Sequence, residues 1–259
     1  MHIAVNGLNA RYRRPKRALY QNLTVDFPDG KVTGLFGPNG VGKSTLLRLL
    51  AHLEDGIISN ALVAAKWATP NAYVAYVPQG YTASLMPWFP VDENISLPLI
   101  ATPASSRVQA AAECAALKDH FKISYPPELT SALSGGQQQT IVLLRALIRK
   151  PELLLLDEPF SALDVYTGAL FRENYFRYLR DHDITTIFVT HDLRECIRFS
   201  DRILFLKRDK AQQKDDPGLA SAELVEFPSD HRQSVASQVY LDGLEESLEP
   251  RFKVGSRQR

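Results

Sequence analysis

The sequence predicts an α/β fold with a mostly parallel core sheet. Short apolar segments alternate with helix-like segments along most of the chain, and a glycine-rich loop at Gly37–Thr45 joins one such strand to a helix. In addition, the run Leu153–Leu156 is apolar without a break, which is typical of a strand covered on both faces. Alternating strands and helices favour a parallel sheet with helices packed on both sides.

The chain begins with two predicted strands, His2–Ala10 and Leu19–Phe27, which we expect to form an antiparallel subdomain. The second alternates apolar with polar residues, as a strand with one buried face does. A turn at Asp29-Gly30 leads into a third strand, Lys31–Phe36, which enters the glycine loop. Further strands are predicted at 72–77, 153–156, 185–190 and 202–206, and helices at 43–53, 105–121, 135–149, 166–182 and 193–199.

The chain is predicted to carry an inserted subdomain and a C-terminal extension. Between Pro87 and Leu133 several prolines are followed by an alanine-rich helical stretch, so we expect a helical subdomain over about residues 87–150 of a domain that spans 1–207. Beyond Lys207 the pattern fades into polar and charged segments. Residues 208–259 form an extension of uncertain order, and a solvated tail and a small partner-binding segment both stay open.

The composition limits the partners that we expect. Thirty basic and 29 acidic residues among 259 give a net charge of +1, so nothing indicates a nucleic-acid partner. Cys114 and Cys196 lack metal-ligand spacing and are expected to be buried thiols in a reducing compartment. No apolar run approaches the roughly 20 residues that span a bilayer. Any membrane role is therefore expected to run through a partner, from a cytoplasmic location.

The strongest chemical signal is the segment Gly37-Pro38-Asn39-Gly40-Val41-Gly42-Lys43-Ser44-Thr45. It meets the phosphate-loop spacing in full, between a strand and a helix as that motif requires. Glycines let the backbone wrap phosphate oxygens with its N–H groups pointing inward, and the helix that begins at Lys43 adds its positive dipole end. We expect Lys43 to reach the β- and γ-phosphates of ATP and Ser44 to ligate Mg²⁺.

Two carboxylates follow the apolar run Leu153–Leu156, namely Asp157 and Glu158. This is the Walker B arrangement, and Asp157 lies at the carboxyl end of a buried strand, where open α/β sheets place their ligand crevices. We expect Asp157 to hold Mg²⁺ through water and Glu158 to orient or deprotonate the attacking water. Alone, such a pair would be a solvated turn, but with the phosphate loop it indicates nucleotide hydrolysis.

A third motif narrows the family. The segment Leu133-Ser134-Gly135-Gly136-Gln137 opens a predicted helix, with Ser134 as a good N-cap and glycines that expose N–H groups to an anion. At this distance before Asp157 it resembles the signature motif of ATP-binding cassette (ABC) ATPases. The resemblance covers roughly Met1–Lys207.

Other positions resemble further motifs of these ATPases. Gln79 resembles the Q-loop glutamine, a ligand of Mg²⁺, and Asp164 belongs to a segment that resembles the D-loop. His191 resembles the switch histidine that contacts the γ-phosphate. Tyr12 resembles the aromatic residue that stacks on adenine, although Tyr20 is a competing candidate.

The resemblance implies that one chain carries only half of each ATP site. In ABC ATPases the signature motif completes the site of a second copy arranged head to tail, so Ser134, Gly135, Gly136 and Gln137 would face the ATP held by a partner chain. Such subunits sit on the inner face of the cell membrane against transmembrane permease subunits. A solute-binding protein often completes the assembled importer.

The segment Leu85–Ile95 resembles that of importers for nitrate, sulfonates, taurine and related solutes, where a permease helix docks. Trp88 would suit that groove, or it would simply pack the helical subdomain. The chain departs from importers at Gln138 and Thr140, where basic residues are usual, and at Cys196-Ile197, where Glu-Ala is usual.

Four other functions fit the sequence less well. An exporter or lipoprotein-releasing ATPase shares the same motifs, and the Pro87-Trp88 segment argues mildly against it. A soluble ABC protein acting on DNA or ribosomes usually carries long coiled coils or two cassettes, and this chain has neither. A non-hydrolysing regulatory subunit does not fit the intact Lys43, Glu158 and His191. A GTPase would need an Asn-Lys-x-Asp motif.

Overall fold

The computed structural model describes residues 3–14, 17–53, 56–60, 65–67, 73–102, 105–125, 129–208, 220–228, 231 and 238–253. They fall into two compact units, one made of Met1–Asn71 with Thr185–Arg259 and one made of Ala72–Ile184. His2 and Ala72, where two predicted strands begin, lie outside the described residues, as does much of the predicted extension.

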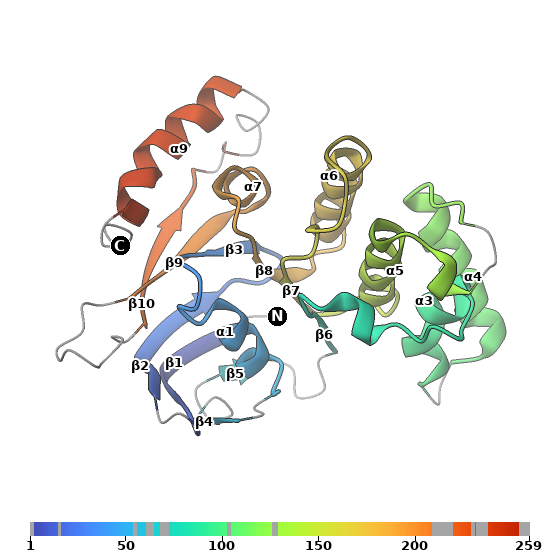
Figure 1. Cartoon of the computed structure of the whole chain (residues 1–259), viewed down its shortest axis with the longest axis horizontal. Coiled ribbons are helices and arrows are strands. Elements are labelled where there is room, and N and C mark those ends of the chain that lie inside the picture. The colour runs from blue at the N-terminus through green and yellow to red at the C-terminus, as the bar shows by residue number, and fades with distance from the viewer. Residues whose placement is uncertain are drawn as a thin grey trace. The chain divides into compact units, whose positions relative to one another are not determined.

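The first unit is a mixed sheet whose parallel strands carry the phosphate loop (Figure 1). Its order is β4(Ile57–Ser59), β1(Ile3–Tyr12), β2(Arg17–Phe27), β10(Ala220–Glu226), β9(Arg202–Arg208), β3(Val32–Phe36) and β8(Thr185–Val189), with β5(Ala65–Trp67) paired to β1. β3 runs parallel to both β8 and β9. β1 runs antiparallel to β2, β4 and β5, which confirms the predicted N-terminal antiparallel sheet.

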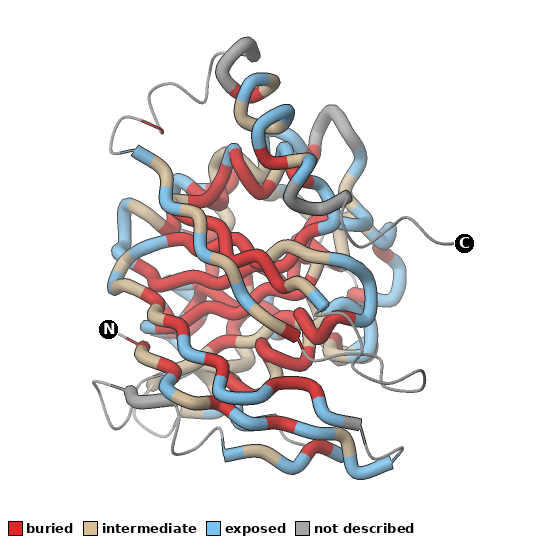
Figure 2. The backbone as a smooth tube through the Cα atoms, turned by 90° about the vertical axis from the view of Figure 1, so that its left-hand side faces the viewer, coloured by how far each residue is buried: buried red, intermediate tan, exposed pale blue. Residues whose placement is uncertain are grey.

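The strand β3 lies at the centre of the parallel part, and its first four residues are buried. Figure 2 shows buried residues concentrated along the strands of the interior. β3 is fixed at its start by Asp201, whose carboxylate accepts a 2.8 Å hydrogen bond from the Val32 N–H, while the Asp201 N–H donates to the Val32 carbonyl at 2.8 Å. These bonds fix the start of β3, the strand that leads into the phosphate loop.

The helix α7(Leu193–Phe199) packs on β3 at Gly34. A Cβ at Gly34 would lie 2.3 Å from Cys196 Sγ and 2.4 Å from Ser200 Oγ, so the approach requires glycine in the strand. Cys196 and Ile197 are both fully buried. The two residues that replace the usual Glu-Ala pair are therefore core residues, and Cys196 packs against β3.

The helix α1(Lys43–Leu50) ends earlier than the predicted 43–53. His52 has φ 57°, and the Leu53 N–H donates to the Arg48 carbonyl at 2.8 Å. A residue in the left-handed region with such a backward bond closes a helix end. Leu53 is therefore exposed and does not continue the apolar face of the helix.

The segment beyond Lys207 contributes to the first unit, where the sequence predicted no regular element. β10 pairs antiparallel with β9 from Ala220↔Arg208 to Glu226↔Arg202 and meets β2 at Tyr20. The helix α9(Gln238–Lys253) packs on α7. The predicted boundary at residue 207 stays a prediction, but these two elements belong to the same compact unit as the phosphate loop.

The second unit combines two parallel strands with helices (Figure 1). β6(Val74–Val77) pairs with β7(Leu153–Asp157), and all five residues of β7 are buried. The helices are η1(Tyr81–Ser84), α3(Val91–Ile100), α4(Arg107–His120), η2(Thr130–Ala132), α5(Gly135–Leu147) and α6(Val165–Asp181). α3 packs on both α4 and α5, as expected for the predicted helical insertion. α3 itself was not predicted, because Pro98 interrupts its pattern.

Candidate functional site

The phosphate loop is held in a shape that only glycine allows at two of its positions. Gly37 has φ 153° and Gly42 φ 118°, in the region that favours glycine. A Cβ at Gly37 would lie 2.3 Å from the Leu206 carbonyl oxygen, and one at Gly42 would lie 2.6 Å from the Tyr20 hydroxyl. The loop is therefore a fitted cradle between β3 and α1.

Lys43 folds back over this cradle. Its ammonium donates to the Gly37 carbonyl at 2.7 Å and to the Pro38 carbonyl at 3.1 Å, and the residue is only 8% exposed. The N-cap of α1 is Gly42, which offers no side-chain oxygen to the first-turn N–H groups, and no acidic residue stands in that turn. The uncapped helix end and the ammonium together make a site for an anion.

Two residues from other strands brace the loop from outside. The Tyr20 hydroxyl donates to the Gly42 carbonyl at 2.7 Å, and the Arg208 guanidinium donates to the Gly40 carbonyl at 2.6 Å. Sequence reasoning missed Arg208, because nothing in its neighbourhood marks it. Since these bonds occupy carbonyls, they leave the loop N–H groups available for phosphate oxygens.

The structure separates the two candidate tyrosines. Tyr20 is 2% exposed, and burial raises the pKa of its phenol above the usual value, so it is a packing residue under the loop. Tyr12 is half-buried, and its hydroxyl lies 2.8 Å from Thr45 Oγ1. Tyr12 therefore lies next to the phosphate loop with part of its surface accessible, as a stacking residue requires.

The predicted switch histidine follows β8 at the exposed position 191. The two residues that flank His191 in the chain, Thr190 and Asp192, both form side-chain hydrogen bonds. Thr190 Oγ1 donates to the Glu195 carboxylate at 2.5 Å and accepts from the Asp192 N–H at 3.1 Å. Asp192 Oδ1 caps α7 by accepting from the N–H groups of Arg194 and Glu195 at 2.8 and 3.3 Å. The backbone around His191 is thereby joined to α7.

The two predicted carboxylates and the Q-loop glutamine lie in the second unit. Asp157 ends β7 and is 3% exposed. Glu158 follows with φ 50°, a left-handed conformation that non-glycine residues rarely adopt and that often marks functional sites. The Gln79 amide donates to Glu158 Oε2 at 3.0 Å. The ends of the parallel strands β6 and β7 thus bring Gln79 and Glu158 together.

The signature segment forms a complete capping box at the start of α5. Ser134 Oγ accepts from the Gln137 N–H at 3.3 Å, and the Gln137 side chain accepts from the Ser134 N–H at 3.0 Å. This reciprocal pair fixes the helix terminus. Ser134 and Gly135 are exposed, whereas Gly136 is half-buried, because a Cβ there would lie 3.1 Å from the Ala162 carbonyl oxygen.

The signature helix is also tied to the segment that resembles the D-loop. Gln139 is buried, and its side-chain oxygen accepts from the Ala162 N–H at 2.9 Å. Asp164 follows two residues later, and its carbonyl accepts from the Gly168 N–H at 3.1 Å as α6 begins. Gln138, one of the departures from the importer pattern, donates instead to the carbonyls of Thr130 and Leu133, each at 3.1 Å.

Comparison with known proteins decides the family. Residues 20–161, more than half of the chain, match the ABC transporter family. The chain belongs to the ABC transporter family. It is 33% identical to an aliphatic sulfonates import ATP-binding protein of Bacillus cereus, over 80% of this chain and 81% of that protein.

Other ABC relatives are longer. An Fe(3+) ions import ATP-binding protein of Pseudomonas fluorescens is 36% identical over 81% of this chain, and a sulfate/thiosulfate import ATP-binding protein of Burkholderia mallei is 36% identical over 84% of it. This chain spans 59% and 63% of the length of these two relatives. A dimeric ATP-binding cassette solved with ADP and phosphate has a TM-score of 0.69 at 23% identity, covering 88% of this chain and 99% of that one, which confirms the predicted fold.

In this ABC chain the segment after the Q-loop presents an exposed tryptophan. Asn94 is buried and bonds the Met86 N–H and the carbonyls of Met86 and Phe89 at 2.9–3.1 Å, which fixes the turn between them. Trp88 within that turn is 64% exposed. The alternative that Trp88 packs inside the helical subdomain is therefore wrong.

The oxygen donors predicted for Mg²⁺ suit that ion. Mg²⁺ keeps several waters and is usually bound by one or two carboxylates with substrate phosphates. Asp157, Ser44 and Gln79 are a carboxylate, a hydroxyl and an amide. In the part of the chain that the structure describes, no cluster of three or more His, Cys, Asp and Glu could hold a metal alone. The donor set therefore fits an ion that arrives with a nucleotide.

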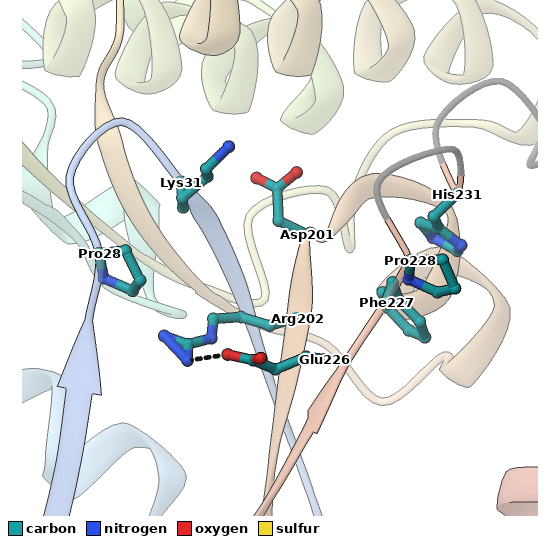
Figure 3. Close-up of a pocket in the computed structure, with 8 residues that line it drawn as sticks. All are labelled: Pro28, Lys31, Asp201, Arg202, Glu226, Phe227, Pro228 and His231. Atoms are coloured by element: carbon teal, nitrogen blue, oxygen red, sulfur yellow. Dashed lines mark hydrogen bonds and ion pairs between the residues drawn. The ribbon is translucent and has the colours of Figure 1, made fainter.

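A cavity of about 360 Å³ lies at the opposite end of β3 from the phosphate loop (Figure 3). Its wall includes Arg202, which is buried and pairs with Glu226 at 2.5 Å while donating to the Asp26 carbonyl at 3.1 Å. Because Arg202 ties β9 to β2 and β10, this wall is structural. The cavity lies beside the amino-terminal ends of β3 and β9, whereas the phosphate loop follows the carboxyl end of β3.

Proposed function

We propose that this chain is the ATP-binding and ATP-hydrolysing subunit of an ABC importer for a small solute. The observation that carries the proposal is the contact of Gln79 with Glu158 at the end of buried β7. A carboxylate held at a strand end by a strained backbone and an amide is poised to act on water. Glu158 would orient or deprotonate the water that attacks the γ-phosphate.

The phosphate loop and the switch histidine would hold the nucleotide. Lys43 would exchange its bonds with Gly37 and Pro38 for the β- and γ-phosphates, while the loop N–H groups cradle the phosphates. Tyr12 would stack on adenine. His191 would contact the γ-phosphate. Phosphoryl transfer is catalysed mainly by positioning and charge neutralisation, which is what this set of groups supplies.

Mg²⁺ would join Ser44, Gln79 and Asp157 to the phosphates. When bound, the ion neutralises charge that develops on the β- and γ-phosphate oxygens. Ser44 would bind it directly, and Asp157 through water. The oxygen-only donor set described above supports this assignment.

A second copy of the chain would complete each site. The exposed Ser134 and Gly135 at the uncovered start of α5 support this proposal, because their helix terminus can accept an anion from another molecule. In a head-to-tail dimer, the signature residues 134–137 would face the γ-phosphate held by the partner, with Asp164 beside the shared interface.

The chain would work against permease subunits on the inner face of the membrane. Among the described residues no helix has the length and apolar character needed to cross a bilayer. Trp88 and Leu129 are exposed and lie on segments joined by a bridge between Pro90 and Leu129. An exposed aromatic anchor of this kind suits a docking surface. The relatives are named importers, and a solute-binding protein would deliver the solute.

Complementation between two defective variants tests the shared site. Lys43→Ala removes the phosphate-loop ammonium, and Ser134→Arg blocks the signature segment. Each variant alone should hydrolyse ATP at a small fraction of the wild-type rate. A mixture should recover activity, since each mixed dimer has one site with both halves intact. A fully active Ser134→Arg chain would contradict the proposal.

A further inference from the structure

We propose that the C-terminal segment, meaning residues 220–228, 231 and 238–253, is a positioning element for the switch histidine and acts on it through α7. The inference rests on the role proposed for His191 above. It concerns the turnover step and not nucleotide binding, because the contacts that hold α7 come from α9 and His231, whereas the loop around Lys43 is braced by Tyr20 on β2 and Arg208 on β9.

His191 and the first turn of α7 are joined and should move together. Thr190 and Asp192 flank the histidine and are bonded to the first turn of α7, through Glu195 at 2.5 Å and through the capping of the Arg194 N–H at 2.8 Å. A shift of the first turn therefore carries the backbone of His191 with it.

The helix α9 holds the first turn of α7 in place. Arg194 forms ion pairs with Asp242 at 3.0 Å and with Glu245 at 2.5 Å, both on α9. Leu241 and Leu248 on α9 are buried, and α9 lies alongside α7 in Figure 1. Burial of the two leucines therefore holds α9 in place, and the carboxylates of Asp242 and Glu245 fix the Arg194 side chain.

His231 provides a second contact, at the C-terminal end of α7. His231 Nε2 donates to the Ile197 carbonyl at 2.8 Å, and that ring is 2% exposed and stacked on Phe227 at 4.0 Å and 13°. Carbonyls in the last turn of a helix lack partners within the helix. His231 satisfies one of them, so α7 is held at one end by α9 and at the other by His231.

These anchors predict what loosening the segment would do. Cys196 and Ser200 would still pack α7 against Gly34 of β3, so the helix would not detach from the sheet. Its first turn would gain freedom, and His191 would be aligned with the γ-phosphate for a smaller fraction of the time. ATP would still bind, but each turnover would take longer.

Removing the two carboxylates is the direct test. We expect the Asp242→Ala/Glu245→Ala double variant of the full chain to lose about three- to tenfold in kcat, the size expected for two half-exposed ion pairs, with unchanged KM and unchanged ATP affinity. Glu246→Ala, on the exposed side of α9, is the matched control. The charge-swapped triple variant Arg194→Glu/Asp242→Lys/Glu245→Lys should recover turnover lost in Arg194→Glu.

Other results would overturn the inference. A wild-type kcat in the double variant would overturn it. So would a joint loss of kcat, ATP affinity and unfolding midpoint in the double variant, if the charge-swapped variant restored none of the three. His191→Ala separates this inference from the proposed function. If His191→Ala is inactive while the α9 variants turn over normally, only the inference fails. If His191→Ala retains full turnover, the role proposed for His191 fails and the inference falls with it.

Discussion

The hydroxyl of Tyr20 donates a 2.7 Å hydrogen bond to the carbonyl of Gly42, the residue just before the phosphate-loop lysine. Both residues are buried. Tyr20→Phe keeps the ring but leaves this carbonyl without its donor, so we expect unfolding to become easier by about 1–3 kcal/mol. Denaturant titration measures this, with Tyr12→Phe as a half-buried control that should change stability less.

Tyr12 should instead govern nucleotide affinity. Its half-buried ring lies beside Thr45, and loss of a base–aromatic stack costs about 1–3 kcal/mol. We expect Tyr12→Ala to weaken ATP binding by about tenfold or more, and Tyr12→Phe to retain most of the affinity. Titration calorimetry with ATP would decide, and equal affinity in Tyr12→Ala would reject the stacking role.

The glycine of β3 should be needed for the seating of α7. A side chain at Gly34 would meet Cys196 Sγ and Ser200 Oγ at 2.3 and 2.4 Å. Overpacking of this kind costs typically about 1–3 kcal/mol, so Gly34→Ala should lower the thermal midpoint. Gly34→Ala/Cys196→Ala/Ser200→Ala should recover part of the loss. A Gly34→Ala chain as stable as wild type would show that α7 can lift from the strand.

The motifs on single segments could be predicted from sequence, because each depends on spacing within a few residues. The phosphate loop, the carboxylates after β7 and the N-cap at Ser134 all fall in this class. Their local geometry follows from glycine conformations and helix-terminal bonding, which adjacent residue types already encode. The alternating strands and helices predicted the fold class for the same reason.

Contacts between distant segments could not be predicted in this way. Arg208 reaches Gly40 across 168 residues, and Gln139 reaches Ala162 from a helix, with no local pattern to mark either. β10 was missed because only Ala220 in it is buried, and two of its four apolar residues are alanines, so no apolar run marks the strand. α3 was missed because Pro98 conceals a helix whose apolar residues pack on two neighbours.

Trp88 should matter for assembly and not for catalysis in the isolated chain. Its exposure and its T-shaped contact with Phe89, at a ring-centroid distance of 6.2 Å, leave one face available to a partner. We expect Trp88→Ala to reduce co-purification with the permease subunits severalfold while ATP affinity stays at the wild-type value. Leu170→Ala, another exposed apolar position, is the control. Normal assembly of Trp88→Ala would remove this surface from the account.

We propose that Glu158 drives hydrolysis of an ATP shared by two chains. Glu158→Gln retains the contact with Gln79 but cannot accept a proton from water. The most direct measurement is size-exclusion chromatography of Glu158→Gln with ATP and Mg²⁺, alongside its ATPase rate. We expect a stable ATP-bound dimer with turnover reduced by about a hundredfold or more. If Glu158→Gln stays monomeric with ATP and hydrolyses it at the wild-type rate, Glu158 does not have this role.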